Sequence, residues 1–470
     1  MTLVGCPGYN LGTMIDISSA TIPELGQALR AGRVTSRSLL EQVYANHNET
    51  LGAYKLWMPD YAARAAALAD TAFAEGLDFG PLQGLPVSVK DLFGLAGTPT
   101  HAGAPKPLPA HWEIEGPVVA AVRNGLAVMT GKTHTVEFAF GGIGSNPHWG
   151  TPRNPWGGKS HRVPGGSSAG AGVSLLEGTA VVALGSDTAG SVRVPASFTG
   201  TVGVKTSYGR WSREGIVPLS PSLDTAGVLA RSVEDAAFTF AAIDPVCRIP
   251  PAPADLAGLR LGMVESFFEN CGPGVTETVR TALTELEDQG VELQSFDFPE
   301  VAIANEIFAK GGLAAPEFVA FIEHELPEFK ATLDPNVRSR FESFGTATAT
   351  DYLGRKRRLA HAAAAANARL ANIDAVVGPT TPITAPLLQH ASEGDGYRTH
   401  NMAALRNTMP GNMLDLCGLS IPAGLDGNGM PVGLQLLVGR GKDEWLISIG
   451  LAVEAVIGPA SRRLGTPPGK

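Results

Sequence analysis

The segment "TAVVALGSDTAGSVRVP" (179–195) joins an apolar run to a loop of hydroxyl-bearing, acidic and small residues. This pattern predicts a buried strand that ends in a polar, glycine-containing loop. Ser186 and Ser191 are candidate nucleophiles in that loop. A serine hydroxyl needs a neighbouring base to accept its proton. The nearest histidine, His161, lies 30 residues before Ser191, so the base is expected from another part of the chain.

A second hydroxyl-rich loop, "PGGSSAGAG" (164–172), precedes the first and is joined to it by "VSLLEGTAVVAL" (173–184). A helix followed by a strand in the joining segment would bring both loops to the same edge of a sheet. Small residues allow close backbone approach, so that N–H groups can point into a cavity. Convergent N–H donors are what an oxyanion hole requires. Composition alone fits two ordinary tight turns equally well.

Strand-like and helix-like segments alternate along most of the chain. "LPVSVKD" (85–91) is followed by "GPVVAAVRNG" (116–125), and "LRLGMV" (259–264) by "VTETVRTALTELEDQG" (275–290). Such alternation predicts an α/β fold: a single large domain with a mixed central β-sheet that helices cover on both faces.

No linker divides the chain, so residues 1–470 are predicted to form one domain with four parts. These parts are an N-terminal helical region (1–80), a core with the catalytic loops (81–298), a helical insertion that shapes the substrate pocket (299–350), and a segment that completes the core (351–470).

Composition excludes several classes of protein. Apolar residues make up 44% of the 470 residues and charged residues 17%, which is typical of a globular chain. The net charge of −9 and the single short basic cluster "GRKRR" (354–358) argue against a nucleic-acid partner. No stretch is expected to span a membrane.

The sequence also predicts no metal and no cofactor. The four cysteines (6, 247, 271 and 417) lack ligand spacing, which favours reduced thiols in a cytoplasmic protein. "GLAVMTGKT" (125–133) has five residues between its glycines, whereas a phosphate-binding loop needs four.

Two lysines are candidates for the missing base, because lysine becomes partly neutral when burial lowers its pKa. Lys90 and Lys205 each end an apolar, strand-like run, and the residues alone do not choose between them. A further alternative is Ser168, the central residue of "GSSAG" (166–170), which matches the G-x-S-x-G nucleophile elbow. The preceding "HRVPG" is not the apolar strand that an elbow requires.

These segments resemble the amidase signature family. "PGGSSAGAG" and "GSDTAGSVRVPA" look like its glycine–serine signature, "LQGLPVSVKDLF" (82–93) is similar to its lysine segment, and "GMPVGLQLLVG" (429–439) is a flanking match. The resemblance extends from about residue 20 to 458.

The resemblance implies a role for each residue of the two loops. Ser191 is implied as the nucleophile, Ser167 as a bridging serine after a cis peptide bond from Gly166, and Lys90 as the base. Lys205 falls outside this triad. The implied oxyanion donors are the backbone N–H groups of Thr188, Ala189, Gly190 and Ser191, and the implied supporting residues are Gly166, Ser168, Asp187 and Arg193.

The implied activity is hydrolysis of carboxylic amides, with aryl amides, esters and carbamates in the same chemistry and no cofactor. The alternatives are an amidotransferase A-type subunit that needs partner subunits, an esterase that uses Ser168, and a non-catalytic binding protein. Family members suggest a homodimer. The chain has Ala169 and Ala189 where the family often has glycine, so the backbone of Ala189 is expected to avoid positive φ.

Overall fold

A mixed β-sheet runs through the molecule. The computed structural model describes residues 15–344 and 346–470, and within them eleven strands form one sheet in the order β1-β3-β2-β4-β6-β5-β10-β11-β9-β7-β8. β2 pairs in parallel with β3 and β4, and β9 and β8 pair in parallel with β7, whereas the pairs between β4 and β9 are antiparallel. The strands are β1 (Tyr54–Trp57), β2 (Pro86–Lys90), β3 (Val128–Thr133), β4 (Val182–Asp187), β5 (Val202–Lys205), β6 (Thr225–Ala230), β7 (Arg260–Met263), β8 (Glu292–Ser295), β9 (Ala375–Pro379), β10 (Leu416–Leu425) and β11 (Pro431–Gly439).

Helices cover both faces of this sheet. Along β4, Ala183 packs in one apolar cluster with α5 (Ala169–Glu177) and α6 (Arg193–Thr199). Its neighbours Val182 and Leu184 belong to the large core that includes α7 (Val233–Ile243). Successive side chains of a strand point to opposite faces, so α5 and α6 lie on one face and α7 on the other. The predicted fold class is confirmed.

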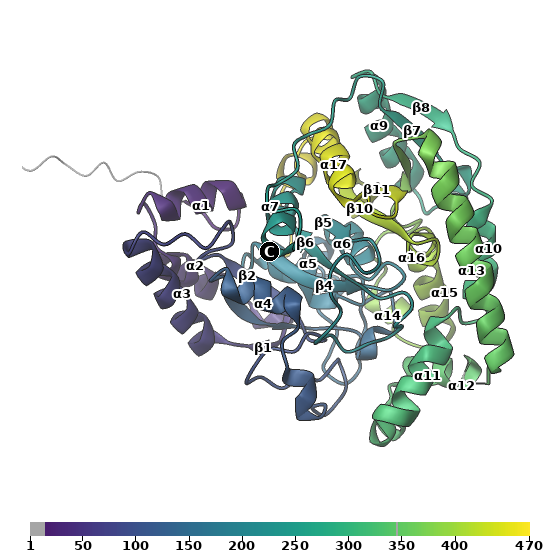
Figure 1. The fold of residues 1–470 in the computed structure, drawn as a ribbon, viewed down its shortest axis with the longest axis horizontal. Helices are drawn as coiled ribbons and strands as arrows, with labels where there is room; N and C mark the ends of the chain where they lie inside the picture. Colours follow the sequence, from purple (N-terminus) through teal and green to yellow (C-terminus); the bar gives the residue numbers. More distant parts are fainter. Residues whose placement is uncertain (1–14, 345) are drawn as a thin grey trace, which may run out of the picture.

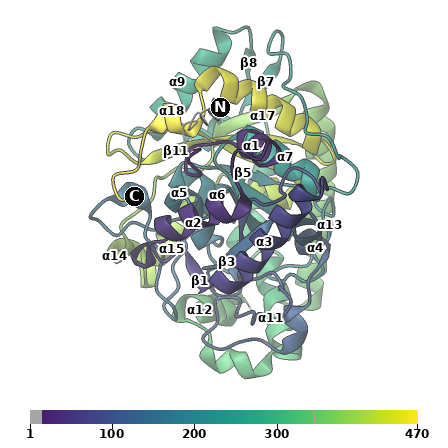
Figure 2. The ribbon, with the colours of Figure 1, turned by 90° about the vertical axis from the view of Figure 1, so that its left-hand side faces the viewer.

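The first three helices lie in the N-terminal region that the sequence predicts to be helical. Thr21 caps α1 (Ile22–Arg30), and its hydroxyl accepts a hydrogen bond from Glu24 N while the Glu24 carboxylate accepts from Thr21 N. This reciprocal pairing satisfies backbone donors that a helix start leaves free. α2 (Ser36–Asn46) and α3 (Pro59–Ala74) follow, and Figures 1 and 2 show these three helices together at one end of the molecule.

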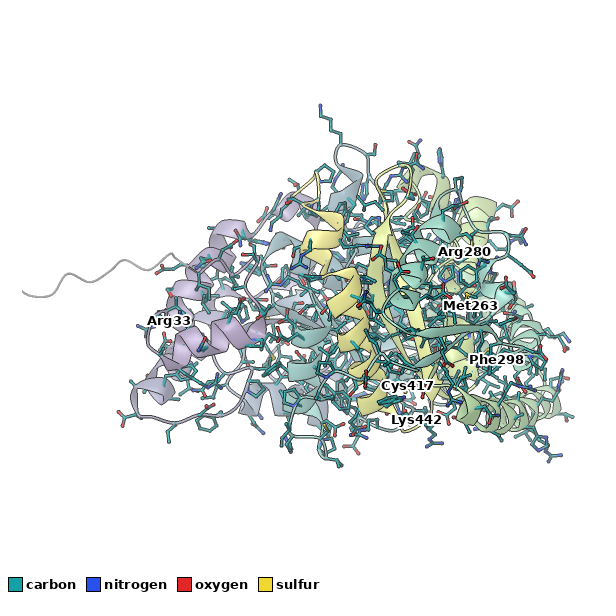
Figure 3. The ribbon with its side chains drawn as sticks, turned by 90° about the horizontal axis from the view of Figure 1, so that it is seen from above. Arg33, Met263, Arg280, Phe298, Cys417 and Lys442 are labelled. Atoms are coloured by element: carbon teal, nitrogen blue, oxygen red, sulfur yellow. The ribbon has the colours of Figure 1, made fainter. Side chains whose placement is uncertain are left out.

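The opposite end is formed by the helices of the 299–350 segment. α10 (Glu300–Ala309), α11 (Ala314–Glu325) and α12 (Pro335–Phe344) lie there beside α13 (Ala349–Arg369) (Figure 1). In Figure 3, Arg33 and Phe298 mark the two ends and Cys417 of β10 lies between them. The division of the chain into four parts stays a prediction.

The remaining helices fill the periphery and the end of the core. They are α4 (Pro117–Asn124), α8 (Glu265–Phe268), α9 (Val275–Glu287), α14 (Leu388–Ala391), α15 (Gly394–Leu405), α16 (Met409–Met413), α17 (Asp443–Ile457) and α18 (Ala460–Leu464).

One helical stretch bears on the expectation that no segment spans a membrane. Asp443–Leu464, which comprises α17 and α18, is long and apolar enough to cross a membrane by length and composition. Half of its most apolar window is buried inside the fold, where α17 packs against β10 and α7. A helix buried in the core of a soluble protein is also long and apolar, so length and composition alone do not identify a membrane span.

The fold predicts that Gly170, near the start of α5, cannot accept a side chain. A Cβ there would lie 2.0 Å from Ala53 O and 2.8 Å from His134 N, both backbone atoms. Overpacking of this kind costs about 1–3 kcal/mol, so Gly170→Ala is expected to lower the urea midpoint of unfolding. The control Gly354→Ala meets nothing within 4 Å on α13 and should stabilise by about 0.5–1 kcal/mol. Equal midpoints for both variants would contradict this packing.

Candidate active site

Lysine and serine residues meet where β2 and β4 end. These strands run in parallel, and Val89 of β2 lies opposite Leu184 of β4. Lys90 closes β2 and Asp187 closes β4, so both side chains stand at the same edge of the sheet. α5 leads from the first serine loop back into β4, as the sequence predicts.

The Lys90 ammonium is fully buried and bonded to two serine hydroxyls. Nζ donates to Ser167 Oγ at 2.7 Å and to Ser186 Oγ at 2.9 Å. Burial lowers the pKa of Lys90 from 10.5 to about 7, although the charges of Asp187 and Asp224 oppose the shift. Desolvation dominates because the low-dielectric interior penalises the charged form. Near neutral pH, Lys90 can therefore both accept and release a proton.

The backbone fixes the position of Ser167. The peptide bond from Gly166 to Ser167 is cis, as the family resemblance implies. Ser167 O accepts hydrogen bonds from Val136 N (3.1 Å) and Ala169 N (2.8 Å). Ser168 lies beside it, and its N–H donates to the carbonyl of Ser191 at 3.3 Å. This bond joins the two serine loops.

Ser168 has no partner that would make it an elbow nucleophile. Its hydroxyl donates only to the carbonyl of Ser186, at 3.5 Å. Across residues 15–344 and 346–470, no histidine side chain is hydrogen-bonded to Ser167, Ser168 or Ser191.

The Asp187 carboxylate organises the loop that carries Ser191. Its Oδ1 accepts from Gly190 N at 2.7 Å, and its Oδ2 accepts from Val192 N at 3.1 Å. Arg193, also fully buried, donates Nε to Oδ2 (3.1 Å) and Nη2 to Oδ1 (3.0 Å). Burial opposes the charge of Asp187, but Arg193 and the backbone donors outweigh it and lower the pKa to about 2.

This arrangement divides the four N–H groups that the resemblance implies as oxyanion donors. The Gly190 N–H donates to Asp187 in this structure, and its role as an oxyanion donor stays a prediction. In the described part of the chain, the N–H groups of Thr188, Ala189 and Ser191 have no acceptor. Ala189 is absent from the residues with positive φ, which confirms the expectation for its backbone.

Sequence reasoning missed several residues that hold this loop. Asp224 accepts from the Thr188 hydroxyl (2.6 Å) and from the N–H groups of Leu219 and Ser220. The Thr408 hydroxyl donates to Ala189 O at 2.7 Å, and Asn412 Nδ2 donates to Asp187 O at 3.0 Å. These residues lie 33 to 221 positions from Ser191, and no local motif links them to it.

Ser191 opens into an apolar pocket of about 100 Å³, here called the insertion pocket. Its walls come from the loop after Glu137, from the Thr188–Ser191 loop, and from the helices of the 299–350 segment. Phe140, Phe308 and Phe344 line it, and Arg340 is the charged side chain at its wall. Arg340 donates to Phe140 O at 2.5 Å, and among the described residues it forms no ion pair.

The described residues contain no cluster of three His, Cys, Asp or Glu side chains that could hold a metal ion. Cys247, Cys271 and Cys417 are free thiols, and Cys6 lies outside the described residues.

The fold and this site define an enzyme that hydrolyses C–N bonds. A sequence profile of the Amidase family matches residues 37–447, so the chain belongs to the amidase family, as its resemblance indicates.

Relatives cover nearly the whole chain. A 2-amino-5-chloromuconic acid deaminase from Comamonas testosteroni is 47% identical, covering 95% of this chain and 98% of the relative. The A-type subunit of a glutamyl-tRNA(Gln) amidotransferase from Akkermansia muciniphila is 31% identical, covering 86% of this chain and 92% of the relative. A crystal structure of an amidase superposes with a TM-score of 0.83 at 31% identity, covering 93% of this chain and 99% of that one.

The burial of Lys90 predicts a pH-dependent stability. From about pH 7 to 10.5 the unfolded chain keeps the Lys90 proton and the native state does not, so the unfolded state binds more protons. The free energy of unfolding of the wild type should therefore rise with pH relative to Lys90→Met, by at most about 1.4 kcal/mol per pH unit. Urea unfolding at pH 7, 8, 9 and 10 measures this difference.

Lys205→Met is the matched control, because the pKa of the buried Lys205 is lowered only to about 8. The free energy of unfolding of the wild type relative to Lys205→Met should therefore begin to rise one pH unit later. A stability difference between wild type and Lys90→Met that stays constant from pH 7 to 10 would contradict the proposed protonation of Lys90.

Proposed function

We propose that this protein hydrolyses the acyl C–N bond of small amides or carbamates, with Ser191 as nucleophile, Ser167 as proton bridge and Lys90 as base. The observation that carries the proposal is the 2.7 Å hydrogen bond from the buried Lys90 ammonium to Ser167, at a lysine whose pKa is about 7. A general base works best when its pKa lies near the working pH.

Acylation begins with two proton transfers. Neutral Lys90 takes the hydroxyl proton of Ser167, and Ser167 takes that of Ser191. The Ser191 oxygen bonds to the acyl carbon, and the carbonyl electrons move to oxygen. The unpartnered N–H groups of Thr188, Ala189 and Ser191 face that oxygen in this proposal. Donors placed where charge develops stabilise the transition state most.

Collapse of the intermediate breaks the C–N bond. The leaving nitrogen receives the proton that Ser191 lost, passed back through Ser167, and departs as amine or ammonia. Water then attacks the acyl-enzyme, its proton follows the same relay to Lys90, and the Ser191 oxygen leaves reprotonated. Asp187 and Arg193 act as positioning residues, because their buried ion pair fixes the loop that presents Ser191.

Esters and carbamates present a carbonyl that the same serine can attack, and an aryl substituent suits the phenylalanine walls of the insertion pocket. The homodimer and the cytoplasmic location stay predictions.

A second candidate function is hydrolytic deamination of a small unsaturated amino acid, as the name of the 47% identical relative states for that protein. Arg340 favours this candidate, because a guanidinium at the pocket wall without an ion-pair partner suits a substrate carboxylate. The amidotransferase reaction would require partner subunits that this chain alone does not supply.

Substitution of the proposed triad should abolish catalysis. Ser191→Ala, Ser167→Ala and Lys90→Met are each expected to lower kcat on a nitrophenyl ester or an anilide by about 10²–10⁴-fold. Ser168→Ala removes only a 3.5 Å hydrogen bond and should stay within about tenfold of wild type. If Ser168→Ala is inactive and Ser191→Ala is active, the elbow mechanism replaces this one.

The rate should follow the charge of Lys90. Because the base must be neutral, kcat/KM is expected to rise about tenfold per pH unit below pH 7 and to level off above it. Residual activity of Lys90→Met should lack this step. A wild-type profile that is flat between pH 5.5 and 8.5 would remove Lys90 from the relay.

A substrate panel separates the two candidate functions. It contains an anilide, an aliphatic amide, a nitrophenyl ester, an aryl carbamate and a 2-aminomuconic acid, and the released amine, phenol or ammonia is measured. We expect Ser191-dependent cleavage of the anilide and the carbamate. Turnover of the aminomuconic acid alone would instead select deamination.

A further inference from the structure

A second cavity adjoins the insertion pocket. This loop cavity has a volume of about 340 Å³ and is walled by residues 213–219, Leu92 and Trp112. The two cavities share three lining residues: Ala139, Thr188 and Leu219. Thr188 carries one of the unpartnered N–H groups, so the cavities meet where the substrate carbonyl would lie.

The loop cavity borders the proton relay, whereas the insertion pocket borders the nucleophile. Ser186 lines the loop cavity, and its hydroxyl accepts from Lys90 Nζ at 2.9 Å. Leu92, another wall residue, follows Lys90 by two positions. Ser191 lines the insertion pocket and not the loop cavity. The two halves of a substrate at Ser191 would therefore face different surroundings.

The chemistry of acyl transfer assigns those halves. When the C–N bond breaks, the nitrogen takes the proton that Ser191 gave to the relay, so the leaving group must face the relay. The acyl group stays bonded to Ser191 Oγ and needs room beside it. The leaving group then belongs in the loop cavity and the acyl group in the insertion pocket.

The walls of the loop cavity are largely apolar, with Arg213, Glu214 and Asp224 as the charged side chains among them, and they are firmly held. Val217 N donates to Leu92 O at 2.9 Å, and Gly94 N donates to Gly215 O at 2.7 Å. The strand-like contact between Phe93 and Ile216 adds a further tie. The cavity reaches solvent at the exposed Glu214, which gives a departing product a way out.

The size of the loop cavity indicates the class of leaving group. Pockets for small organic ligands measure about 300–1,000 Å³, and a water molecule, close to ammonia in size, takes about 30 Å³. A volume of about 340 Å³ with Trp112, Leu92 and Ile216 in its walls exceeds what ammonia needs. Its surface suits an aromatic or branched apolar group.

We infer that the loop cavity is a leaving-group subsite for apolar, aromatic amines or alcohols. This inference rests on the proposed function and extends it by naming the substrate class. Aryl amides and N-aryl carbamates meet its requirement, since their nitrogen carries a ring that enters the cavity as the C–N bond breaks.

The main comparison uses three substrates and two variants of the full-length protein, and Ile216→Ala and Ser191→Ala complete the test. Benzanilide and benzamide share the acyl group and differ in the leaving group, whereas benzanilide and acetanilide share the leaving group and differ in the acyl group. Ile216→Phe narrows the loop cavity. Ala314→Leu narrows the insertion pocket and is the matched control.

Ile216→Phe should lower kcat/KM for benzanilide relative to benzamide by about tenfold or more, since filling an apolar pocket excludes a group of that size. In the same variant, the ratio of kcat/KM for benzanilide to kcat/KM for acetanilide should change far less. Ala314→Leu should change the kcat/KM ratio of benzanilide to acetanilide and leave the ratio of benzanilide to benzamide nearly unchanged. Should Ile216→Phe fail to fold, Ile216→Ala is expected to favour a naphthylamide over benzanilide compared with wild type.

The outcomes separate the inference from the proposed function. If wild type cleaves none of the substrates, or Ser191→Ala cleaves them equally well, both fail. If cleavage depends on Ser191 but Ile216→Phe affects benzamide as much as benzanilide and Ile216→Ala gives no gain, the subsite is overturned and the proposed function stands. If Ala314→Leu instead lowers kcat/KM for benzanilide relative to benzamide, the assignment of the two cavities is reversed.

Discussion

The burial of one ammonium group at the end of β2 is the constraint on which the rest of the site depends. The Lys90 Nζ lies 2.7 Å from Ser167 Oγ and 2.9 Å from Ser186 Oγ, and no carboxylate of the described residues forms an ion pair with it. An ion pair at that place would hold the proton on the lysine. Here the carboxylates of Asp187 and Asp224 act only at a distance, so desolvation prevails and the pKa falls to about 7. The sheet makes this possible, because β2 lies between β3 and β4 and is buried along its whole length.

The neighbouring carboxylate has a different task. Asp187 is the last residue of β4, the strand that pairs with β2. Its charge is fully matched by Arg193 and by the N–H groups of Gly190 and Val192. A buried ion pair of this kind adds little stability in itself, but removing one partner leaves an uncompensated charge. Its value lies in geometry: it fixes the turn that presents Ser191. The remaining N–H groups of Thr188, Ala189 and Ser191 are left without acceptors in the described chain. Asp187 thus holds the loop of the proposed nucleophile, whereas β2 carries the proposed base.

The two cavities beside the proposed triad are walled largely by segments outside it. The insertion pocket is closed by helices of the 299–350 segment, and the loop cavity by residues 213–219. Both elements are anchored to the core by hydrogen bonds of backbone N–H groups: Val217 N donates to Leu92 O, and Asp334 N donates to the side-chain Oε2 of Glu137. Relatives that share the core at 31–47% identity bear names for different reactions.

Local patterns in the sequence predicted many of the elements and narrowed the candidate reactive residues to a few serines and two lysines. Apolar runs predicted β2, β4 and β5, and the paired serine loops with the lysine segment indicated the family. These features are short-range, since periodicity, capping and motif spacing act over a few residues.

Only the tertiary structure decided which lysine is desolvated next to serine, and which N–H groups stay free. Lys90 and Lys205 look alike in sequence, but their surroundings come from strands far apart in the chain. The engagement of Gly190 by Asp187 depends on side-chain geometry in a turn, and the contacts of Asp224, Thr408 and Asn412 join segments up to 225 residues apart. Desolvation and long-range hydrogen bonding arise from packing, and packing exists only once the chain is folded.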